Sequence, residues 1–482
     1  MRILFVYKMP SIDVVGPLGL LHIIAIAKQE GHECSLLVWD LERNFIEKAV
    51  ISNPDIVCYS VTTGSEKAYL RINSLLKSRM SFFSIFGGAH PTFYPEFIEN
   101  ICVDSICRGE SEQSFKELIS RIEEGKNISA IPNFWFKEKG QIIKNELAPL
   151  IENLDSIPFP DRELIDKYFN YRAYGKINVI TGRGCPFDCS YCFNHKLKKY
   201  YSGKGRYIRK RSVDNVLSEV KSYVAKYDIK EIYFVDDVFS IDMTWLAEFA
   251  EKYKKQINLP YCCHLRANLT TEKTVKKLKE SNCVYVWLGI ESGNPHLRQL
   301  VLNRDITDQQ IYQASKWIKE YGLKLSTFNM IGLPGETIEN AFETVQLNVK
   351  CRPDYAWVSM LQPYPDTELY NFSLKNNLLK SEHRIEANFH NSTPFKLKDE
   401  KQVENLHDFF AIAVNFKFLI PLIRQTIKLP KNVIFKIIRN VHKFYSYLRT
   451  GEVRLSYMFI RHLVIFIYVK AANFLLYRDD KP

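Results

Sequence analysis

Residues 182–195 have the sequence GRGCPFDCSYCFNH, which follows a β-strand pattern and sets three cysteines in C-x3-C-x2-C spacing. These are Cys185, Cys189 and Cys192. Three thiolates on one tight loop can hold three irons of a cubane cluster, which normally takes four cysteine ligands. No fourth cysteine is near in the sequence, so one iron would stay open to another molecule. Gly182 and Gly184 allow the sharp turn that such a loop needs.

Zinc is the alternative metal for this loop. Structural zinc sites are closed by four ligands, usually from two paired knuckles. His195 is the one local residue that could serve as a fourth ligand. The spacing therefore favours an iron–sulfur cluster over zinc.

A series of βα units follows from the same strand. The further strands are expected at residues 231–237, 261–268, 284–292, 324–334 and 356–365. Helical patterns separate them, so residues 176–390 predict a (β/α)6-type barrel, partial or complete. In such a barrel the chemistry lies on the loops after the strands.

The remaining chain divides by pattern into three parts. Residues 1–130 alternate short apolar strands with amphipathic helices, which predicts an α/β, doubly wound, Rossmann-like domain with a parallel sheet. Residues 131–175 are rich in turn and proline signals and are interpreted as a connector. Residues 391–482 are helical, basic and aromatic, and carry no recognisable chemistry.

Composition excludes several classes of protein. The 482 residues are 46% hydrophobic and 25% charged, as in ordinary globular proteins. Of the net charge of +12, most lies in residues 401–482, which hold 14 Lys and Arg against 5 Asp and Glu. Such a region favours an acidic partner, namely anionic lipid, nucleic acid or a phosphorylated substrate, although a solvated helical face has the same pattern.

Cysteine usage and apolar runs bear on location. The 11 cysteines are odd in number and too sparse for a disulfide scaffold, and no leader pattern opens the chain, so a cytoplasmic location is expected. The apolar run at residues 455–477 is interrupted by Arg461, His462 and Lys470. A spanning helix is disfavoured, and a buried helix or peripheral contact with the inner membrane surface is expected instead.

The cysteine loop resembles the signature of the radical SAM superfamily, C-x3-C-x-aromatic-C, with Tyr191 in the aromatic position. The resemblance implies a [4Fe–4S] cluster whose open iron binds S-adenosylmethionine. Reductive cleavage, with electrons from a flavodoxin- or ferredoxin-like donor, would give a 5′-deoxyadenosyl radical that abstracts hydrogen from a substrate. The protein would orient these groups and exclude water.

The resemblance continues, in the family's order, at the later strand ends. Asp236 and Asp237, in FVDDVF, are expected at the methionine amino group, since carboxylates accept hydrogen bonds from an ammonium; a helix N-cap pair is the alternative. Arg266, in HLRAN, would pair with the methionine carboxylate or a substrate anion. The other implied contacts are Glu291 and Ser292 of GIESG at the ribose, Arg304 in the same pocket, and Gly332 and Pro334 of GLPGET at adenine.

Residues 1–130 resemble the cobalamin-binding domain of one radical SAM subgroup. The matching segments are PLGLLHIIAIAKQEGHE, DIVCYSVTT, GGAHPTFYPE and ICRGESE. Ser60 and Thr62 would present hydroxyls to the corrin tail, and Gly87 and Gly88 would let the backbone approach the ligand. Tight βα turns are the alternative interpretation of these four residues.

The first loop departs from cobalamin domains that ligate cobalt through D-x-H-x-x-G. Residues 7–16 are YKMPSIDVVG and contain no histidine, so the implied cobalamin is base-off without a histidine ligand. His90 is a polar contact or, more simply, a turn histidine. The resemblance extends over residues 1 to about 390.

The resemblance predicts a cobalamin-dependent radical SAM methyltransferase acting on an unactivated carbon, or phosphorus, of a small-molecule or lipid substrate. A cyclisation, rearrangement or oxidation without methyl transfer is the first alternative. An RNA-modifying methylthiotransferase is less favoured, because Cys34, Cys58, Cys102 and Cys107 lack the spacing of a second cluster. A cobalamin- or lipid-surface-binding module with a merely structural cluster is disfavoured, because such a module needs no nucleoside pocket. A nucleic-acid partner is not expected.

Overall fold

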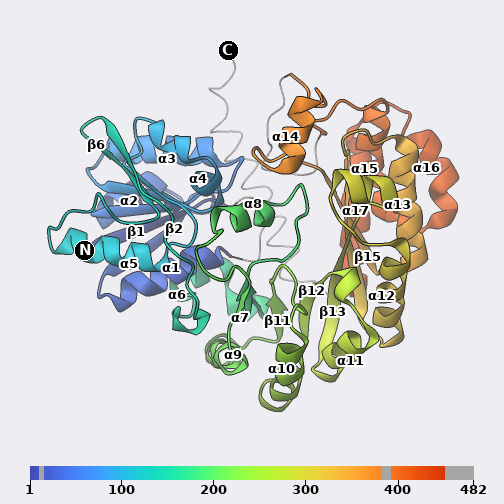
Figure 1. Cartoon of the computed structure of the whole chain (residues 1–482), viewed down its shortest axis with the longest axis horizontal. Helices are drawn as coiled ribbons and strands as arrows, with labels where there is room; N and C mark the ends of the chain where they lie inside the picture. Colours follow the sequence, from blue (N-terminus) through green and yellow to red (C-terminus); the bar gives the residue numbers. More distant parts are fainter. Residues whose placement is uncertain (10–15, 382–391, 451–482) are drawn as a thin grey trace. The chain divides into compact units, whose positions relative to one another are not determined.

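The computed structural model describes residues 1–9, 16–381 and 392–450 and divides into two compact units (Figure 1). Among these residues, unit 1 comprises Met1–Tyr174 with Tyr200–Tyr207. Unit 2 comprises Gly175–Lys199 and the described residues between 208 and 450.

Unit 1 is a seven-stranded sheet in the order β2-β1-β3-β4-β5-β6-β7. Its parallel strands are β1 (Arg2–Tyr7), β2 (Glu33–Val38), β3 (Ile56–Ser60), β4 (Phe83–Gly87) and β5 (Ser105–Cys107). Its main helices are α1 (Leu18–Gln29), α2 (Phe45–Ser52), α3 (Glu66–Lys77), α4 (Ala89–Phe93) and α5 (Glu112–Glu123). Side chains alternate along a strand, so Leu4 and Val6 pack with α2 and α3 in one core while Ile3 and Phe5 are buried on the other face. The expected doubly wound domain is confirmed.

Residues 131–175, interpreted above as a connector, contribute to the same sheet. They contain β6 (Phe134–Glu138) and β7 (Gln141–Lys144), a hairpin that extends β5 in antiparallel fashion. The short helices α6 (Glu163–Phe169) and α7 (Tyr171–Tyr174) follow. The strand signal was the alternation of Phe134 and Phe136, both buried, around a half-exposed tryptophan.

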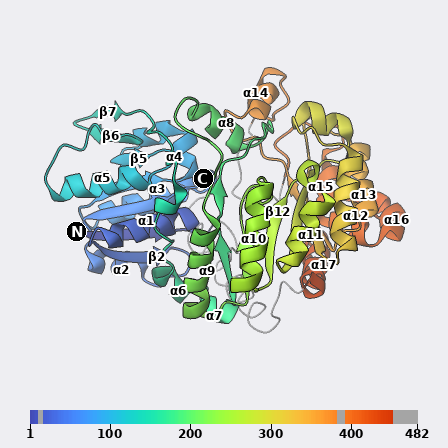
Figure 2. The same cartoon turned by 60° about the horizontal axis from the view of Figure 1, so that its bottom comes forward.

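Unit 2 has a six-stranded, all-parallel sheet in the order β15-β14-β13-β12-β11-β8. The strands are β8 (Lys176–Val179), β11 (Glu231–Phe234), β12 (Tyr261–Leu265), β13 (Cys283–Glu291), β14 (Lys324–Ile331) and β15 (Tyr355–Met360). The flanking helices, labelled in Figure 2, are α9 (Val213–Tyr227), α10 (Met243–Gln256), α11 (Glu272–Glu280), α12 (Asp308–Glu320) and α13 (Ile338–Cys351). The described β8 and β15 do not pair with each other, so the expected (β/α)6 barrel is confirmed in its open form.

Threonine caps fix where the loops of this barrel end. Thr271, Thr307 and Thr337 each accept a hydrogen bond from the backbone N–H three residues on, and the side chain at that position reaches back to the cap. This capping box satisfies two otherwise unpaired amide groups at a helix start. The helices α11, α12 and α13 therefore begin at set positions, which keeps the strand-end loops in place.

The C-terminal part contains α14 (Glu368–Lys375), α15 (Glu400–Asn415), α16 (Ile420–Thr426) and α17 (Val433–Thr450). Phe409 and Phe410 of α15 pack against α13 and β15, so α15 covers the open edge of the barrel. The described range is helical, as expected. No helix in it has the length and apolar character needed to cross a membrane. The apolar run at residues 455–477 lies outside the described residues.

Candidate functional site

The cysteine loop lies between the two-residue strand β9 (Gly182–Arg183) and α8 (Phe193–Tyr200). Cys189 is buried, and two guanidinium groups point at its sulfur: Arg266 Nη1 donates to Sγ at 3.4 Å and Arg304 Nη1 at 3.9 Å. Positive groups of this kind stabilise a thiolate, the form that binds metal. The donor set therefore fits an anionic iron–sulfur cluster.

The other two thiols are half-buried and lie near enough to Cys189 for their charges to interact. Burial raises the pKa of Cys185, and it raises the pKa of Cys192 to about 12. Both must lose a proton when they bind iron. Among the described residues no three His, Cys, Asp or Glu side chains converge on the position of a single metal ion. A cubane cluster does not require this, because each of the three thiolates binds a different iron.

Neighbouring elements hold the loop in place. His195 of α8 contacts Asp188 Oδ1 through Nδ1 at 2.6 Å and Glu368 Oε1 of α14 through Nε2 at 2.7 Å. The Ser190 amide donates to Leu302 O at 3.0 Å. Because both ring nitrogens of His195 are occupied by carboxylates, neither is available to zinc, and the fourth ligand of that alternative is lost.

The two adjacent aspartates after β11 have different environments. Asp236 is buried and accepts hydrogen bonds from the Thr181 amide at 3.0 Å, the Thr181 hydroxyl at 2.7 Å and Lys210 Nζ at 3.2 Å. Asp237 keeps contact with solvent. Partial desolvation by the surrounding protein, with the charge of Asp236, raises the pKa of its carboxyl. Its charge also acts on Cys185 and Cys192. Asp237 is thus the carboxylate beside the cysteine loop.

Glu291, half-buried at the end of β13, lies beside the buried Arg304. Glu291 has φ of 66°, a left-handed conformation that is costly for a side chain with a Cβ. Its Oε1 lies 3.7 Å from Arg304 Nη2, which donates to Gly289 O at 2.7 Å. Arg304 Nε is buried without a hydrogen-bond partner among the described residues. An unsatisfied buried donor beside a strained carboxylate is typical of a ligand site.

Tyr191 and Ser292 are placed differently around this pair. Tyr191 hydrogen-bonds Glu291, and burial raises the pKa of its phenol far above the ordinary value. Ser292 is fully buried, and its hydroxyl accepts from the Asn294 amide at 3.3 Å. The structure therefore brings Tyr191 to the site and uses the Ser292 hydroxyl within its own turn.

The GLPGET turn after β14 contains a residue that the sequence interpretation missed. Gly332, with φ of 77°, and Leu333 both donate their amides to Glu336 Oε2. Pro334 and Glu336 are buried, and burial raises the pKa of the Glu336 carboxyl to about 8. Glu336 could have been identified from the sequence, because it is the one acidic residue of the GLPGET motif and directly follows its turn.

Glu336 predicts a dependence of stability on pH. Its folded pKa of about 8 exceeds the ordinary 4.5, so its contribution to stability is complete below pH 4.5 and is lost as the pH rises through 8. Glu336→Gln stays neutral throughout. Between about pH 6 and about pH 9 the melting temperature of the unchanged protein should fall relative to this variant by about 2–5 °C.

Glu339→Gln is the matched control for this prediction. Arg424 lowers the pKa of the Glu339 carboxyl, so that residue titrates only below its ordinary value of 4.5. Its melting curve should run parallel to that of the unchanged protein in the same pH range. Parallel behaviour of Glu336→Gln as well would contradict the prediction.

The carboxyl edge of the unit 1 sheet carries the second group of expected residues. The Ser60 hydroxyl is half-buried and makes no hydrogen bond within the described residues. Thr62 instead contacts the Ser65 hydroxyl at 3.1 Å. His90 is buried and contacts the Thr63 hydroxyl at 3.3 Å, as a turn histidine does.

The two glycines of this edge have different roles. A Cβ on Gly88, whose φ is 96°, would lie 2.9 Å from Val61 O, so the turn itself requires glycine there. A Cβ on Gly87 would meet nothing closer than 3.9 Å. The free Ser60 hydroxyl and the open Gly87 are thus the features of this edge that fit a ligand.

Comparison with known proteins identifies the domain in each unit. Residues 179–347 match the radical SAM superfamily, and residues 13–119 match the B12 binding domain. An uncharacterized methyltransferase of Pyrococcus horikoshii is 33% identical over 374 residues, which cover 75% of this chain and 79% of that protein. The chain belongs to the radical SAM superfamily. Its B12-binding domain assigns it to the cobalamin-binding members, as the sequence predicted.

Two further similarities extend this result. An anaerobic magnesium-protoporphyrin IX monomethyl ester cyclase of Rubrivivax gelatinosus is 26% identical, over 77% of this chain and 69% of that protein. The structure of the cobalamin-dependent S-adenosylmethionine radical enzyme OxsB has a TM-score of 0.69 at 18% identity, covering 100% of this chain and 73% of that one, and shows the shared fold.

Membership of the radical SAM superfamily makes this chain an enzyme. It implies a [4Fe–4S] cluster and S-adenosylmethionine, and the B12-binding domain implies cobalamin. Such an enzyme acts on a substrate and needs an electron donor.

Proposed function

We propose that this radical SAM enzyme is a cobalamin-dependent methyltransferase that methylates an unactivated carbon, or phosphorus, of a small-molecule or lipid substrate. The observation that carries the proposal is the convergence of Arg266 and Arg304 on the sulfur of Cys189, at the carboxyl end of the barrel strands. When bound, the cluster supplies the electron that cleaves S-adenosylmethionine and cobalamin supplies the methyl group.

The proposed roles follow from the contacts of each side chain. Cys185, Cys189 and Cys192 would hold the cluster. Glu291 and Arg304, which lie 3.7 Å apart, would meet the nucleoside, and the unpaired Nε of Arg304 is available to it. The main-chain turn of Gly332 and Pro334 would lie along adenine.

The remaining polar residues have different proposed roles around the methionine end of S-adenosylmethionine. We assign its ammonium to Asp237, which is solvent-accessible and near the cysteines, in preference to Asp236. Asp236 holds Thr181 and Lys210 and so positions the loop that leads to the cysteines. Arg266 would pair with the methionine carboxylate, since a guanidinium binds a carboxylate through two parallel hydrogen bonds.

Cobalamin would bind at the carboxyl edge of the unit 1 sheet, near Ser60 and Gly87. Residues 7–16 contain no histidine, which supports a base-off cofactor without a histidine ligand. Residues 10–15 of that segment lie outside the described residues. An electron-paramagnetic-resonance spectrum of the cob(II)alamin form without nitrogen hyperfine splitting would support this assignment, and a spectrum with that splitting would contradict it.

A second reaction has support from one relative. The Rubrivivax gelatinosus protein is named a cyclase, so methyl transfer is not the reaction of every similar protein. RNA modification has less support, because Cys58 and Cys107 are buried within strands of unit 1 and provide no second cluster site there.

The test is cofactor content followed by product mass. After anaerobic cluster reconstitution, the full chain is incubated with hydroxocobalamin and passed over a gel-filtration column. We expect near-stoichiometric corrin, 5′-deoxyadenosine when S-adenosylmethionine and a strong reductant are added, and a product heavier by one CH2 unit. Iron and sulfide without corrin would overturn the proposal. Corrin with an altered product lacking the extra CH2 would favour the second reaction.

A further inference from the structure

The outer face of α17 is apolar, although a helix of a globular protein usually buries its apolar face. The residues turned inward are Phe435, His442 and Ser446, with Arg439 half-buried beside them. Val433, the first residue of the helix, is exposed (68%), and five further exposed apolar residues follow at helical spacing: Ile434 (59%), Ile437 (53%), Ile438 (37%), Val441 (63%) and Tyr445 (47%). We call these five residues the α17 stripe.

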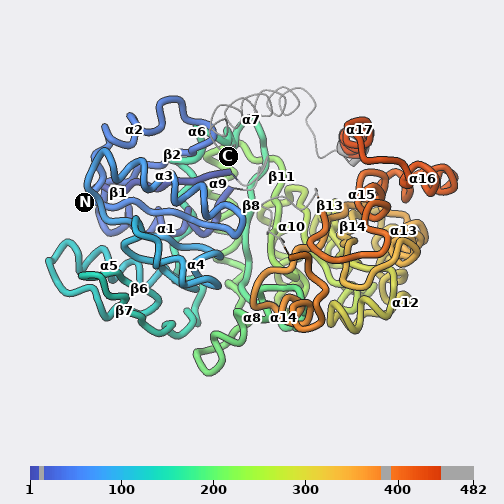
Figure 3. Tube along the Cα trace, turned by 90° about the horizontal axis from the view of Figure 1, so that it is seen from above, coloured from blue at the N-terminus to red at the C-terminus, as the bar shows by residue number. Residues whose placement is uncertain are grey.

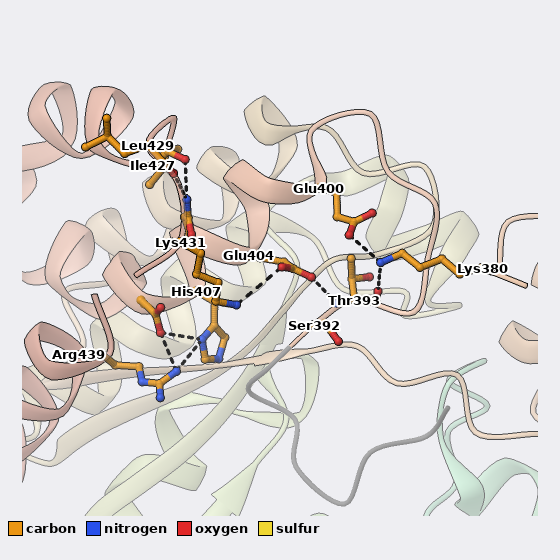
Figure 4. Close-up of polar contacts among 12 residues, drawn as sticks. Lys380, Ser392, Thr393, Glu400, Glu404, His407, Ile427, Leu429, Lys431 and Arg439 are labelled. Atoms are coloured by element: carbon orange, nitrogen blue, oxygen red, sulfur yellow. Dashed lines mark hydrogen bonds and ion pairs between the residues drawn. The ribbon is translucent and has the colours of Figure 1, made fainter. Parts of the chain in front are cut away.

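Polar anchors fix this orientation of the helix (Figure 4). Arg439 Nη1 donates to Asp408 Oδ1 of α15 at 2.7 Å and contacts His407 Nδ1 at 3.2 Å. Asp408 and His407 are both buried. Rotating α17 to bury its stripe would leave the buried Asp408 carboxylate without its cation, at a cost of several kcal/mol. The stripe therefore faces outward because of how the helix is anchored.

The turn that leads into α17 is also held by hydrogen bonds, and the residues near it expose further apolar side chains. Asn405 Nδ2 donates to Ile427 O and to Leu429 O, each at 2.9 Å, which fixes the turn between α16 and α17. Leu422 and Leu429 are exposed by 64% and 55%. Figure 3 shows α16 and α17 at the margin of unit 2, joined to it through α15. Among the residues that the structure describes, nine of the 17 large exposed hydrophobic side chains lie between residues 418 and 445.

All the charged side chains of the same region are positive. Residues 409–450 contain eight Lys and Arg and no Asp or Glu. Some of these cations pair with acids elsewhere, as Arg424 does with Glu339, Lys431 with Glu404 and Arg439 with Asp408. The net positive charge of residues 409–450 opposes docking of a second copy of the same surface, since like charges repel. It attracts the phosphates of anionic lipids, as basic residues near a membrane surface do.

We infer that the α17 stripe binds the surface of an anionic lipid bilayer. A helix of this kind lies in the plane of the membrane, with its apolar face among the upper acyl chains and the surrounding positive charge near the headgroups. The inference is independent of the reaction proposed above. It gives the enzyme a peripheral membrane location in which a lipid-soluble substrate would be concentrated.

The test is sedimentation of the full-length, cluster-loaded enzyme with vesicles. The vesicles contain phosphatidylglycerol with phosphatidylcholine, or phosphatidylcholine alone. The double variant Ile434→Glu, Ile437→Glu should bind the anionic vesicles at least about tenfold more weakly than the unchanged enzyme. The matched control is Ile51→Glu, Ile101→Glu, which changes two exposed isoleucines of unit 1 (82% and 97%) and alters the charge equally. The control should bind as the unchanged enzyme does.

Melting temperature, iron content and mass in solution are measured on the same samples. The inference requires them to be unchanged in the α17 variant. A fall in melting temperature would mean that the chain itself covers the stripe, and a change in oligomeric state would mean that a second copy does. Either result would overturn the inference, as would unchanged vesicle binding by the variant or no binding by the unchanged enzyme.

Discussion

Replacing Cys189 with serine is expected to remove the cluster and to reduce formation of 5′-deoxyadenosine by about a thousandfold or more, because the cluster performs the reductive step. Cys189 is the buried cysteine of the loop and the one that both Arg266 and Arg304 contact. A serine hydroxyl stays protonated and neutral, so both buried cations would face a neutral group where a cluster-bound thiolate would carry negative charge. The measurements are iron and sulfide content after reconstitution and the rate of S-adenosylmethionine cleavage.

Cys34→Ser is the control for this variant. Cys34 lies in β2 of unit 1 and is half-buried, and burial raises the pKa of its thiol to about 11. It should therefore remain protonated, and its loss should leave iron content and cleavage rate unchanged. Full iron content in the Cys189 variant would mean that the loop does not form the site.

The strands and the cysteine loop could be predicted from the sequence because they depend on local signals. Apolar runs such as Arg2–Tyr7 and Cys283–Glu291 become strands wherever they pack, and the spacing of Cys185, Cys189 and Cys192 is itself local. The hairpin of β6 and β7 was missed because its strands are short and lie beside turn signals.

The environments of single side chains could not be predicted in the same way. Asp236 and Asp237 are adjacent and chemically identical. The difference between them comes from Lys210, which the antiparallel pairing of β9 with the two-residue strand β10 (Arg209–Lys210) brings to Asp236. Such pairings join residues far apart in the chain, so no local pattern contains them.

The orientation of α17 illustrates the same limit at a larger scale. Its apolar stripe, taken alone, predicts a face buried against the protein. The opposite face is buried because Asp408 and His407, on α15, need Arg439 beside them. A buried ion pair can thus override the hydrophobic pattern of a helix, since breaking it costs more than leaving a few apolar side chains in water.

Gly293→Ala is expected to destabilise unit 2 by about 3 kcal/mol and to lower its melting temperature by about 5–10 °C. A Cβ at this position would lie 2.4 Å from Glu343 O and 2.5 Å from Thr344 Cα, both backbone atoms of α13 that cannot rotate away. The Gly293 amide donates to Thr344 Oγ1 at 2.9 Å, so the loop and the helix are already in contact. Scanning calorimetry measures the effect.

The glycine acts on the site through Glu291, two residues earlier. Forcing the loop away from α13 would move the strained Glu291 relative to Arg304, so the KM for S-adenosylmethionine should rise together with the loss of stability. Gly19→Ala is the control: Gly19 is an exposed residue of α1, and a Cβ there would meet nothing within 4 Å. That change should raise stability by about 0.5–1 kcal/mol, since alanine favours the helix. An unchanged melting temperature in Gly293→Ala would mean that α13 can yield at this contact, and the last glycine of GIESG would then be dispensable for the position of Glu291.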